Sequence, residues 1–232
     1  MSRMEFNFNA FYDKWKYFHC AFNLTGIFAA VAIGDASPWL ISQLISFSLV
    51  LVSIIKSLSF KPIVIGYANC ITLTRLIIIL ILGFSYNELD NFTLFVWFLF
   101  TICLDGVDGF LARKFRHSSN QGEIFDMEVD SFMVLLLCWI HFDINDIGWW
   151  ILIPGSLRYS FEFLNSWIKK HEITQLPKKV RSSIAVLFFL SLLGPFVLSN
   201  SFAHYLLILA TCFIFISFFA PILLCLLLKL RK

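Results

Sequence analysis

The feature that most constrains this chain is a series of apolar segments that alternate with short polar links. We place eight such segments, each close to the ~20 residues that a helix needs to cross a bilayer. They cover residues 18–34, 38–57, 66–86, 91–112, 122–141, 147–166, 182–199 and 203–228. Of the 232 residues, 59% are apolar and the mean hydropathy is +0.82, a balance that excludes a soluble domain. The sequence predicts an all-α polytopic membrane protein with about eight spans.

The basic residues fall almost entirely on one side of this predicted arrangement. Four alternate links hold no Lys or Arg: 35–37, 87–90, 142–146 and 200–202. The other links and both ends of the chain hold all 18 basic residues except Arg75 and Arg158. Because basic links stay in the cytoplasm, this pattern predicts an even number of spans with both chain ends cytoplasmic.

Four aspartates lie at or within the fourth and fifth predicted spans: Asp105, Asp108, Asp126 and Asp130. A carboxylate inside a membrane is costly unless it is paired or binds a metal, and the neighbouring side chains offer too few cations. The first two share a helix face with Gly109 and Ala112, and the last two share one with Gly122. The link between the spans is short, so we expect antiparallel neighbours whose carboxylates converge. This arrangement predicts a divalent metal site suited to phosphate chemistry.

Two arginines lie inside predicted spans, at a depth close to that of the aspartates: Arg75 in the third span and Arg158 in the sixth. Two alternatives stay open for Arg158. It forms an ion pair with Glu162 one helical turn away, or it binds an anionic substrate. Glu123 and Glu128 lie off the aspartate stripe, and we leave them out of the predicted site.

The aspartates belong to a longer pattern, D-x2-D-G-x2-A-R-x8-G-x3-D-x3-D, which resembles the signature of the CDP-alcohol phosphotransferase (CDP-alcohol phosphatidyltransferase) family. All eight specified positions match: Asp105, Asp108, Gly109, Ala112, Arg113, Gly122, Asp126 and Asp130. The upstream stretch NCITLTR is similar to a second element of that family, N-x2-T-x2-R, through Asn69, Thr72 and Arg75. The resemblance covers roughly residues 62–230. We therefore expect residues 1–61 to form a surface segment and a helical hairpin, and residues 62–232 to form a six-span catalytic core.

The resemblance implies an activity and a set of site residues. Family members cleave a CDP-linked donor and transfer its phosphoalcohol half to a hydroxyl, with release of CMP. It implies two divalent cations, Mg²⁺ or Mn²⁺, held by Asp105, Asp108, Asp126 and Asp130, with Asp130 also the catalytic base. The implied nucleotide contacts are Gly109, Ala112, Arg113, Gly122, Asn69 and Thr72. It also implies a homodimer, and no nucleic-acid partner is expected.

The donor we expect is CDP-diacylglycerol, used with a small polar alcohol in the plasma (inner) membrane of a bacterium, with the site facing the cytoplasm. Five basic residues favour an anionic acceptor such as glycerol 3-phosphate: Arg75, Arg158, Lys178, Lys179 and Arg181. A CDP-choline or CDP-ethanolamine enzyme with diacylglycerol as acceptor remains an alternative. A divalent-cation transporter is a third hypothesis, although acids clustered at one end of the spans argue against a continuous pathway.

Overall fold

The computed structural model describes residues 8–59, 67–115, 120–145, 147–167 and 178–230. Side chains are described over most of these ranges. The exceptions include every side chain in 57–59, 67–69, 107–115, 164–167 and 220–230. The described residues form eight α-helices and three short 3₁₀ turns and contain no strand. The predicted all-α class is therefore confirmed.

The helices are α1 (Phe8–Ile33), α2 (Ser37–Ser59), α3 (Tyr67–Ser85), α4 (Asn91–Phe115), α5 (Asn120–Asp143), α6 (Leu152–Trp167), α7 (Lys178–Leu193) and α8 (Asn200–Leu230). The 3₁₀ turns are η1 (Tyr86–Glu88), η2 (Trp149–Ile151) and η3 (Gly194–Phe196). Among the described residues, α1, α2, α3 and α8 hold the four stretches that are long and apolar enough to cross a membrane, and α4 and α7 hold shorter apolar ones. The protein is a polytopic membrane protein, and the count of eight spans stays a prediction.

The first helix differs most from its predicted bounds, since α1 begins at Phe8 rather than near residue 18. Lys14 and Lys16 lower the hydropathy of its first turns, yet Trp15 and His19 lie one turn apart and are both buried. The helix ends at Ile33, and the positive φ of 74° at Gly34 allows the N–H of Asp35 to reach the carbonyl of Ala30 at 3.2 Å. This turn sends the chain directly into α2.

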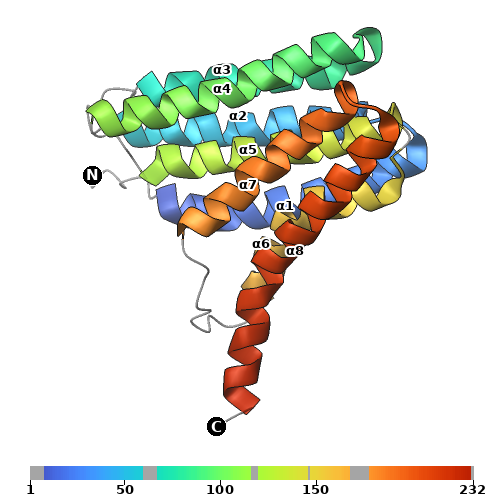
Figure 1. Cartoon of the computed structure of the whole chain (residues 1–232). Helices are drawn as coiled ribbons and strands as arrows, with labels where there is room; N and C mark the ends of the chain where they lie inside the picture. The colour runs from blue at the N-terminus through green and yellow to red at the C-terminus, as the bar shows by residue number, and fades with distance from the viewer. Residues whose placement is uncertain (1–7, 60–66, 116–119, 146, 168–177, 231–232) are drawn as a thin grey trace, which may run out of the picture.

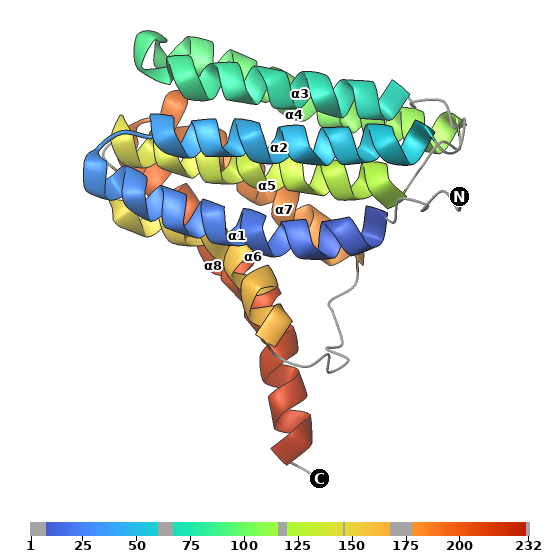
Figure 2. The ribbon, with the colours of Figure 1, turned by 180° about the vertical axis from the view of Figure 1, so that it is seen from behind.

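The helices pack as a bundle with α5 at its centre (Figures 1 and 2). Helix α3 packs against α4 and α5, α1 packs against α2 and α6, and α5 also packs against α6 and α7. Helix α8 crosses the bundle obliquely, and its C-terminal part extends away from the other helices. The N-terminal hairpin thus contacts the rest of the chain mainly along α6, through α1, and also along α3, through α2. The division into residues 1–61 and 62–232 stays a prediction.

The stretch of α5 from Leu135 to Ile140 is apolar on all sides and has no exposed face. Every residue from Leu135 to Ile140 is fully buried. Helix α6 approaches closely at Gly155, where an added Cβ would lie 2.9 Å from the Sγ atom of Cys138. Tight packing on every side fixes the position of α5, so the polar residues in its first half stand on a rigid element.

Polar contacts join helices at the end of α5 that is remote from Asp126 and Asp130. The Tyr86 hydroxyl donates to Asp143 at 2.6 Å and accepts a hydrogen bond from Trp139 at 3.0 Å. Nearby, Asp90 precedes α4 and accepts hydrogen bonds from the Thr93 hydroxyl at 2.6 Å and from its backbone N–H at 3.1 Å. Both hydrogen bonds lower the pKa of Asp90, and the bond from the Thr93 hydroxyl contributes most. The bond from the Thr93 N–H satisfies one backbone donor of the first turn of α4.

Candidate metal centre

Three of the four predicted aspartates converge in space. Asp105 comes from α4, and Asp126 and Asp130 come from successive turns of α5. One carboxylate oxygen from each lies within 4.8 Å of the others, close enough to share a cation. The three side chains are partly exposed, at 42%, 33% and 29% respectively. The cluster is therefore open on one side.

Arg75 of α3 lies on the closed side of this cluster. Its Nη1 atom donates to Oδ1 of Asp105 at 2.9 Å and to Oδ1 of Asp126 at 2.7 Å, and its Nη2 atom donates to Oδ1 of Asp130. The arginine side chain itself is fully buried. Among these four residues, one guanidinium thus faces three carboxylates, which is an excess of two formal negative charges.

The two helices that carry the aspartates were predicted to be close neighbours, but among the described residues α4 and α5 pack little against each other, because α3 packs against both. The carboxylates nevertheless converge as predicted. Arg75 stands where it can contact acids from both helices. Sequence reasoning placed Arg75 at the right depth but did not identify it as the counterion of the aspartates. Its matching depth in the neighbouring span was the signal available.

Carboxylate oxygens in this arrangement are the ligands that Mg²⁺ and Mn²⁺ prefer in proteins. Mg²⁺ is commonly held by a few carboxylates together with water and substrate phosphates, and a half-exposed group of three acids suits that mode. The residues present therefore fit a divalent metal site. Asp108 lies on α4 one turn beyond Asp105, and its side chain is outside the described residues.

The remaining predicted site residues divide into two groups. Thr72 is buried on α3 one turn before Arg75, and Gly122 lies on α5 one turn before Asp126. The side chains of the others lie outside the described residues: Asn69, Gly109, Ala112, Arg113, Lys178, Lys179 and Arg181. Their predicted roles stay predictions.

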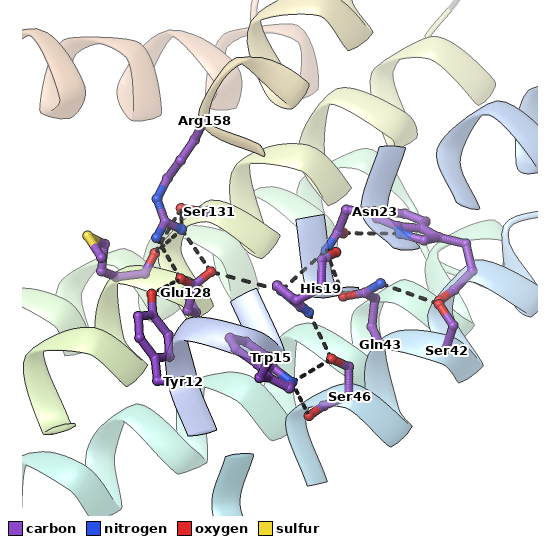
Figure 3. Close-up of polar contacts among 12 residues, drawn as sticks. Tyr12, Trp15, His19, Asn23, Ser42, Gln43, Ser46, Glu128, Ser131 and Arg158 are labelled. Carbon is purple, nitrogen blue, oxygen red and sulfur yellow. Dashed lines mark hydrogen bonds and ion pairs between the residues drawn. The ribbon is translucent and has the colours of Figure 1, made fainter. Parts of the chain in front are cut away.

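Arg158 forms an ion pair that sequence reasoning did not consider. Its guanidinium contacts Glu128 of α5 through both nitrogens, at 2.7 and 3.0 Å, rather than Glu162 one turn along its own helix. The Tyr12 hydroxyl of α1 donates to the same carboxylate at 2.8 Å (Figure 3). Glu128 lies two residues from Asp126, and the sequence did contain a signal, because an intramembrane acid and an intramembrane arginine each need a partner.

The comparisons with known proteins identify the family. The sequence profile described as CDP-alcohol phosphatidyltransferase matches residues 66–219, about two thirds of the chain. The chain belongs to the CDP-alcohol phosphatidyltransferase family. The matched region begins just before α3 and ends within α8, so it contains Arg75 and all three clustered aspartates. Helices α1 and α2 lie outside it.

The chain is similar to several curated bacterial proteins. Three of them, from Yersinia enterocolitica, Yersinia pestis and Yersinia pseudotuberculosis, are each named CDP-diacylglycerol–glycerol-3-phosphate 3-phosphatidyltransferase and are 31% identical to this chain over 103 residues. The matched stretch covers 40% of this chain and about half, 53%, of each relative. No solved structure matches the chain.

Proposed function

We propose that this member of the CDP-alcohol phosphatidyltransferase family transfers a phosphatidyl group from CDP-diacylglycerol to the hydroxyl of a small polar alcohol and releases CMP. The observation that carries the proposal is the convergence of Asp105, Asp126 and Asp130 on one side of the bundle. A pyrophosphate donor is anionic, and the leaving nucleotide gains charge as its bond breaks. A site with excess carboxylate binds such a substrate only together with divalent cations.

Asp105, Asp108, Asp126 and Asp130 would hold two such cations, Mg²⁺ or Mn²⁺. The cations supply charge stabilisation to the pyrophosphate and to the departing CMP. The remaining chemistry belongs to the chain. The acceptor oxygen attacks the phosphorus that bears diacylglycerol, the bond from that phosphorus to the bridging oxygen breaks, and CMP leaves with that oxygen. Asp130 takes the proton of the attacking hydroxyl, for which a base within hydrogen-bond reach is needed.

The nucleotide half of the donor would lie along α4 and the start of α5. Gly109 and Ala112 leave room for close approach on the face of α4 that carries the aspartates, and Arg113 follows them in the motif. Gly122 provides the same small surface on α5. Asn69 and Thr72 of α3 complete this proposed set, and Thr72 lies one turn from Arg75.

For the acceptor, we propose glycerol 3-phosphate. The names of the bacterial relatives support this choice, as does the number of basic residues in the proposed acceptor set. Lys178, Lys179 and Arg181 are the proposed contacts for its phosphate, whereas Arg75 is buried against the three aspartates and is left out of this set. The contacts of Arg158 with Glu128 support a different role for that arginine, developed below.

The proposed setting is the inner membrane of a bacterium, with the aspartates facing the cytoplasm, and the proposed assembly is a homodimer. The bacterial relatives and the one-sided distribution of Lys and Arg support the setting. Labelling of single cysteines at residues 35 and 61 in closed vesicles would test the orientation. A cysteine at residue 35 should react only with reagent on the external side of the membrane, and a cysteine at residue 61 only with reagent on the cytoplasmic side.

The decisive test is a CMP-release assay on the full chain in lipid vesicles. The donors are CDP-diacylglycerol, CDP-choline and CDP-ethanolamine, and the acceptors are glycerol 3-phosphate, glycerol, serine, inositol and diacylglycerol. We expect CMP only from CDP-diacylglycerol, only with Mg²⁺ or Mn²⁺, and fastest with glycerol 3-phosphate. Release from CDP-choline with diacylglycerol would move the protein to the alternative enzyme class. No CMP from any pair would refute the proposed activity.

The same vesicles test the transporter hypothesis. A cation pathway needs polar groups that continue across the membrane, whereas α5 beyond Asp130 is apolar from Phe132 to Ile140 and fully buried from Leu135 onward. We therefore expect no uptake of Mn²⁺ into sealed vesicles above the rate of protein-free ones.

A further inference from the structure

Glu128 lies on α5 between Asp126 and Asp130 but on the opposite side of the helix. Two residues of an α-helix correspond to ~200° of rotation, so a side chain at 128 points away from the face that carries 126 and 130. The Glu128 side chain is only 5% exposed. A buried carboxylate in a membrane protein has to be compensated, and groups from two other helices compensate this one.

The first of these groups is Arg158 of α6. Its Nη2 atom donates to Oε1 of Glu128 at 2.7 Å and its Nη1 atom to Oε2 at 3.0 Å. The same Nη1 also donates to the carbonyl of Met127 at 3.0 Å and to the hydroxyl of Ser131. All of these acceptors lie on one turn of α5. Arg158 therefore fixes α6 against the turn of α5 that carries the clustered aspartates on its other side.

The second group comes from α1, which lies outside the region that matches the family. The Tyr12 hydroxyl donates to Oε1 of Glu128 at 2.8 Å. The Nε2 atom of His19, two turns further along α1, lies 3.9 Å from Oε2. Figure 3 shows both side chains directed from α1 toward the Glu128 carboxylate. A helix that precedes the matched region thus supplies a hydrogen bond to the helix that carries the aspartates.

Buried hydrogen bonds within the hairpin α1–α2 hold His19 in place and join the two helices. His19 Nδ1 lies 2.9 Å from the Ser46 hydroxyl of α2, and the Trp15 indole donates to the same hydroxyl at 3.1 Å. Asn23 donates to Gln43 at 3.1 Å. All five side chains are buried, and leaving any of them unsatisfied would be costly. The hairpin therefore has one register, and that register places Tyr12 and His19 against Glu128.

We propose that the N-terminal hairpin is a positioning element of the metal centre, acting through Tyr12, His19 and Glu128 on the turn of α5 that bears Asp126 and Asp130. The inference rests on the proposed function for the identity of the metal centre. The three residues are positioning residues, because they touch neither metal nor substrate. Metal coordination tolerates errors of only about 0.2 Å in ligand position, and Mg²⁺ demands near-octahedral geometry. A small rotation of α5 would therefore weaken the site.

The test compares two Tyr→Phe variants of the full chain in lipid vesicles, with Mn²⁺ binding followed by the spin resonance signal of the free ion. Tyr12→Phe removes the hydrogen bond to Glu128. Tyr159→Phe is the matched control, because its hydroxyl is buried in the same region yet has no hydrogen-bond partner among the described residues. We expect Tyr12→Phe to weaken Mn²⁺ binding about three- to tenfold, below the ~10–100-fold typical of groups that contact a metal ligand directly. Tyr159→Phe should bind Mn²⁺ like the wild type.

A second variant, Glu128→Gln, keeps the shape of the side chain and removes its charge. It should weaken Mn²⁺ binding more than Tyr12→Phe does, and if it does not fold, the Tyr12→Phe titration decides alone. A Tyr12→Phe variant with wild-type Mn²⁺ affinity would overturn the inference, as would one whose unfolding temperature falls while its Mn²⁺ affinity stays unchanged. Failure of the proposed function is a separate result, since it appears as wild-type protein that binds Mn²⁺ but releases no CMP.

Discussion

Helix α5 carries acidic side chains on two opposite faces, and each face meets one arginine. On the aspartate face, Asp126 and Asp130 join Asp105 around the guanidinium of Arg75, and the three carboxylates are 29–42% exposed. On the glutamate face, Glu128 is 5% exposed, forms an ion pair with Arg158 and accepts a hydrogen bond from Tyr12. The first face has more acid than base and is open. The second is balanced one to one and closed.

This difference separates a binding site from a structural ion pair within one helical turn. On the glutamate face, the carboxylate is satisfied by Arg158 and Tyr12, so it has little capacity for a further ligand. On the aspartate face, the charge that remains calls for a divalent cation. A buried charge in a membrane protein is therefore informative only once its partners are counted.

The largest effect we expect is from Asp130→Asn, which removes the proposed base from the aspartate face. Turnover should fall about a thousandfold or more, at the upper part of the range for loss of a general base, because Asp130 also belongs to the proposed ligand set. Nucleotide binding should change only a few-fold. The measurement is CMP release together with equilibrium binding of CDP-diacylglycerol. Asp143→Asn, at the far end of α5, is the control, and retained turnover in Asp130→Asn would show that the base is another group.

Removing Arg75 should expose the charge imbalance directly. In Arg75→Gln, three carboxylates lose their shared counterion, and we expect a loss of about 3–5 kcal/mol of unfolding free energy in the absence of divalent cations. Saturating Mg²⁺ should restore most of that loss, because the cation then compensates the carboxylates. Unfolding in detergent with and without Mg²⁺ measures both quantities.

Arg158→Gln is the matched control for Arg75→Gln, since it removes an arginine from the other face of the same helix. It should be destabilising to a similar degree, because Glu128 is left buried without its cation, but Mg²⁺ should not restore the loss. Its KM for glycerol 3-phosphate should stay within about threefold of wild type, since a tenfold change would require about 1.4 kcal/mol of lost binding. Equal rescue of both variants by Mg²⁺ would remove the distinction between the faces.

A smaller effect is expected from Gly155→Ala, which forces α6 away from α5 near the middle of the bundle. The added Cβ would lie 2.9 Å from the Sγ of Cys138 and 3.2 Å from a methyl group of Leu135. We expect a loss of about 1–3 kcal/mol of unfolding free energy, as for other overpacked sites. Cys138→Ala in the same chain should recover part of the loss. An unaltered unfolding temperature in Gly155→Ala would show that α5 and α6 separate freely.

The smallest effect is expected from Ser131→Ala. The Ser131 hydroxyl accepts a hydrogen bond from Arg158, but the guanidinium keeps Glu128 and the carbonyl of Met127 as acceptors. We expect about 0.5–1.5 kcal/mol of lost stability and unchanged acceptor KM. Both are measured on the same preparation, and a large rise in KM would place Arg158 in the acceptor site instead.

Most of the helical architecture could be predicted from the sequence, because runs of ~20 apolar residues in a membrane allow only helices or closed barrels. Segments such as 91–112, observed as α4 from Asn91 to Phe115, follow directly from hydropathy. The first turns of α1 could not be found this way, because Lys14 and Lys16 mask the buried stripe that contains Trp15. The start of α6 was also predicted too early, since Gly148 has a φ of 86° and leads into a 3₁₀ turn before Leu152.

The composition of the candidate site followed from spacing within single helices, which is why Asp105, Asp126 and Asp130 were found together. The partners of Arg75 and Arg158 could not be predicted from such spacing. Arg75 contacts acids 30, 51 and 55 positions away, and Arg158 reaches Glu128 30 positions back. Helical spacing offers only neighbours at i+3 and i+4, such as Glu162, so these pairs depend on how α3, α5 and α6 pack.

The central claim is that the aspartate face binds divalent cations, and Mn²⁺ binding to wild type, Asp126→Asn and Glu123→Gln tests it most directly. Glu123 is exposed one turn before Asp126 on the same helix, so the two variants lose the same charge at neighbouring positions. The account predicts that Asp126→Asn weakens Mn²⁺ binding at least about tenfold while Glu123→Gln binds like wild type. Equal binding by all three proteins, or no binding by any, would contradict it.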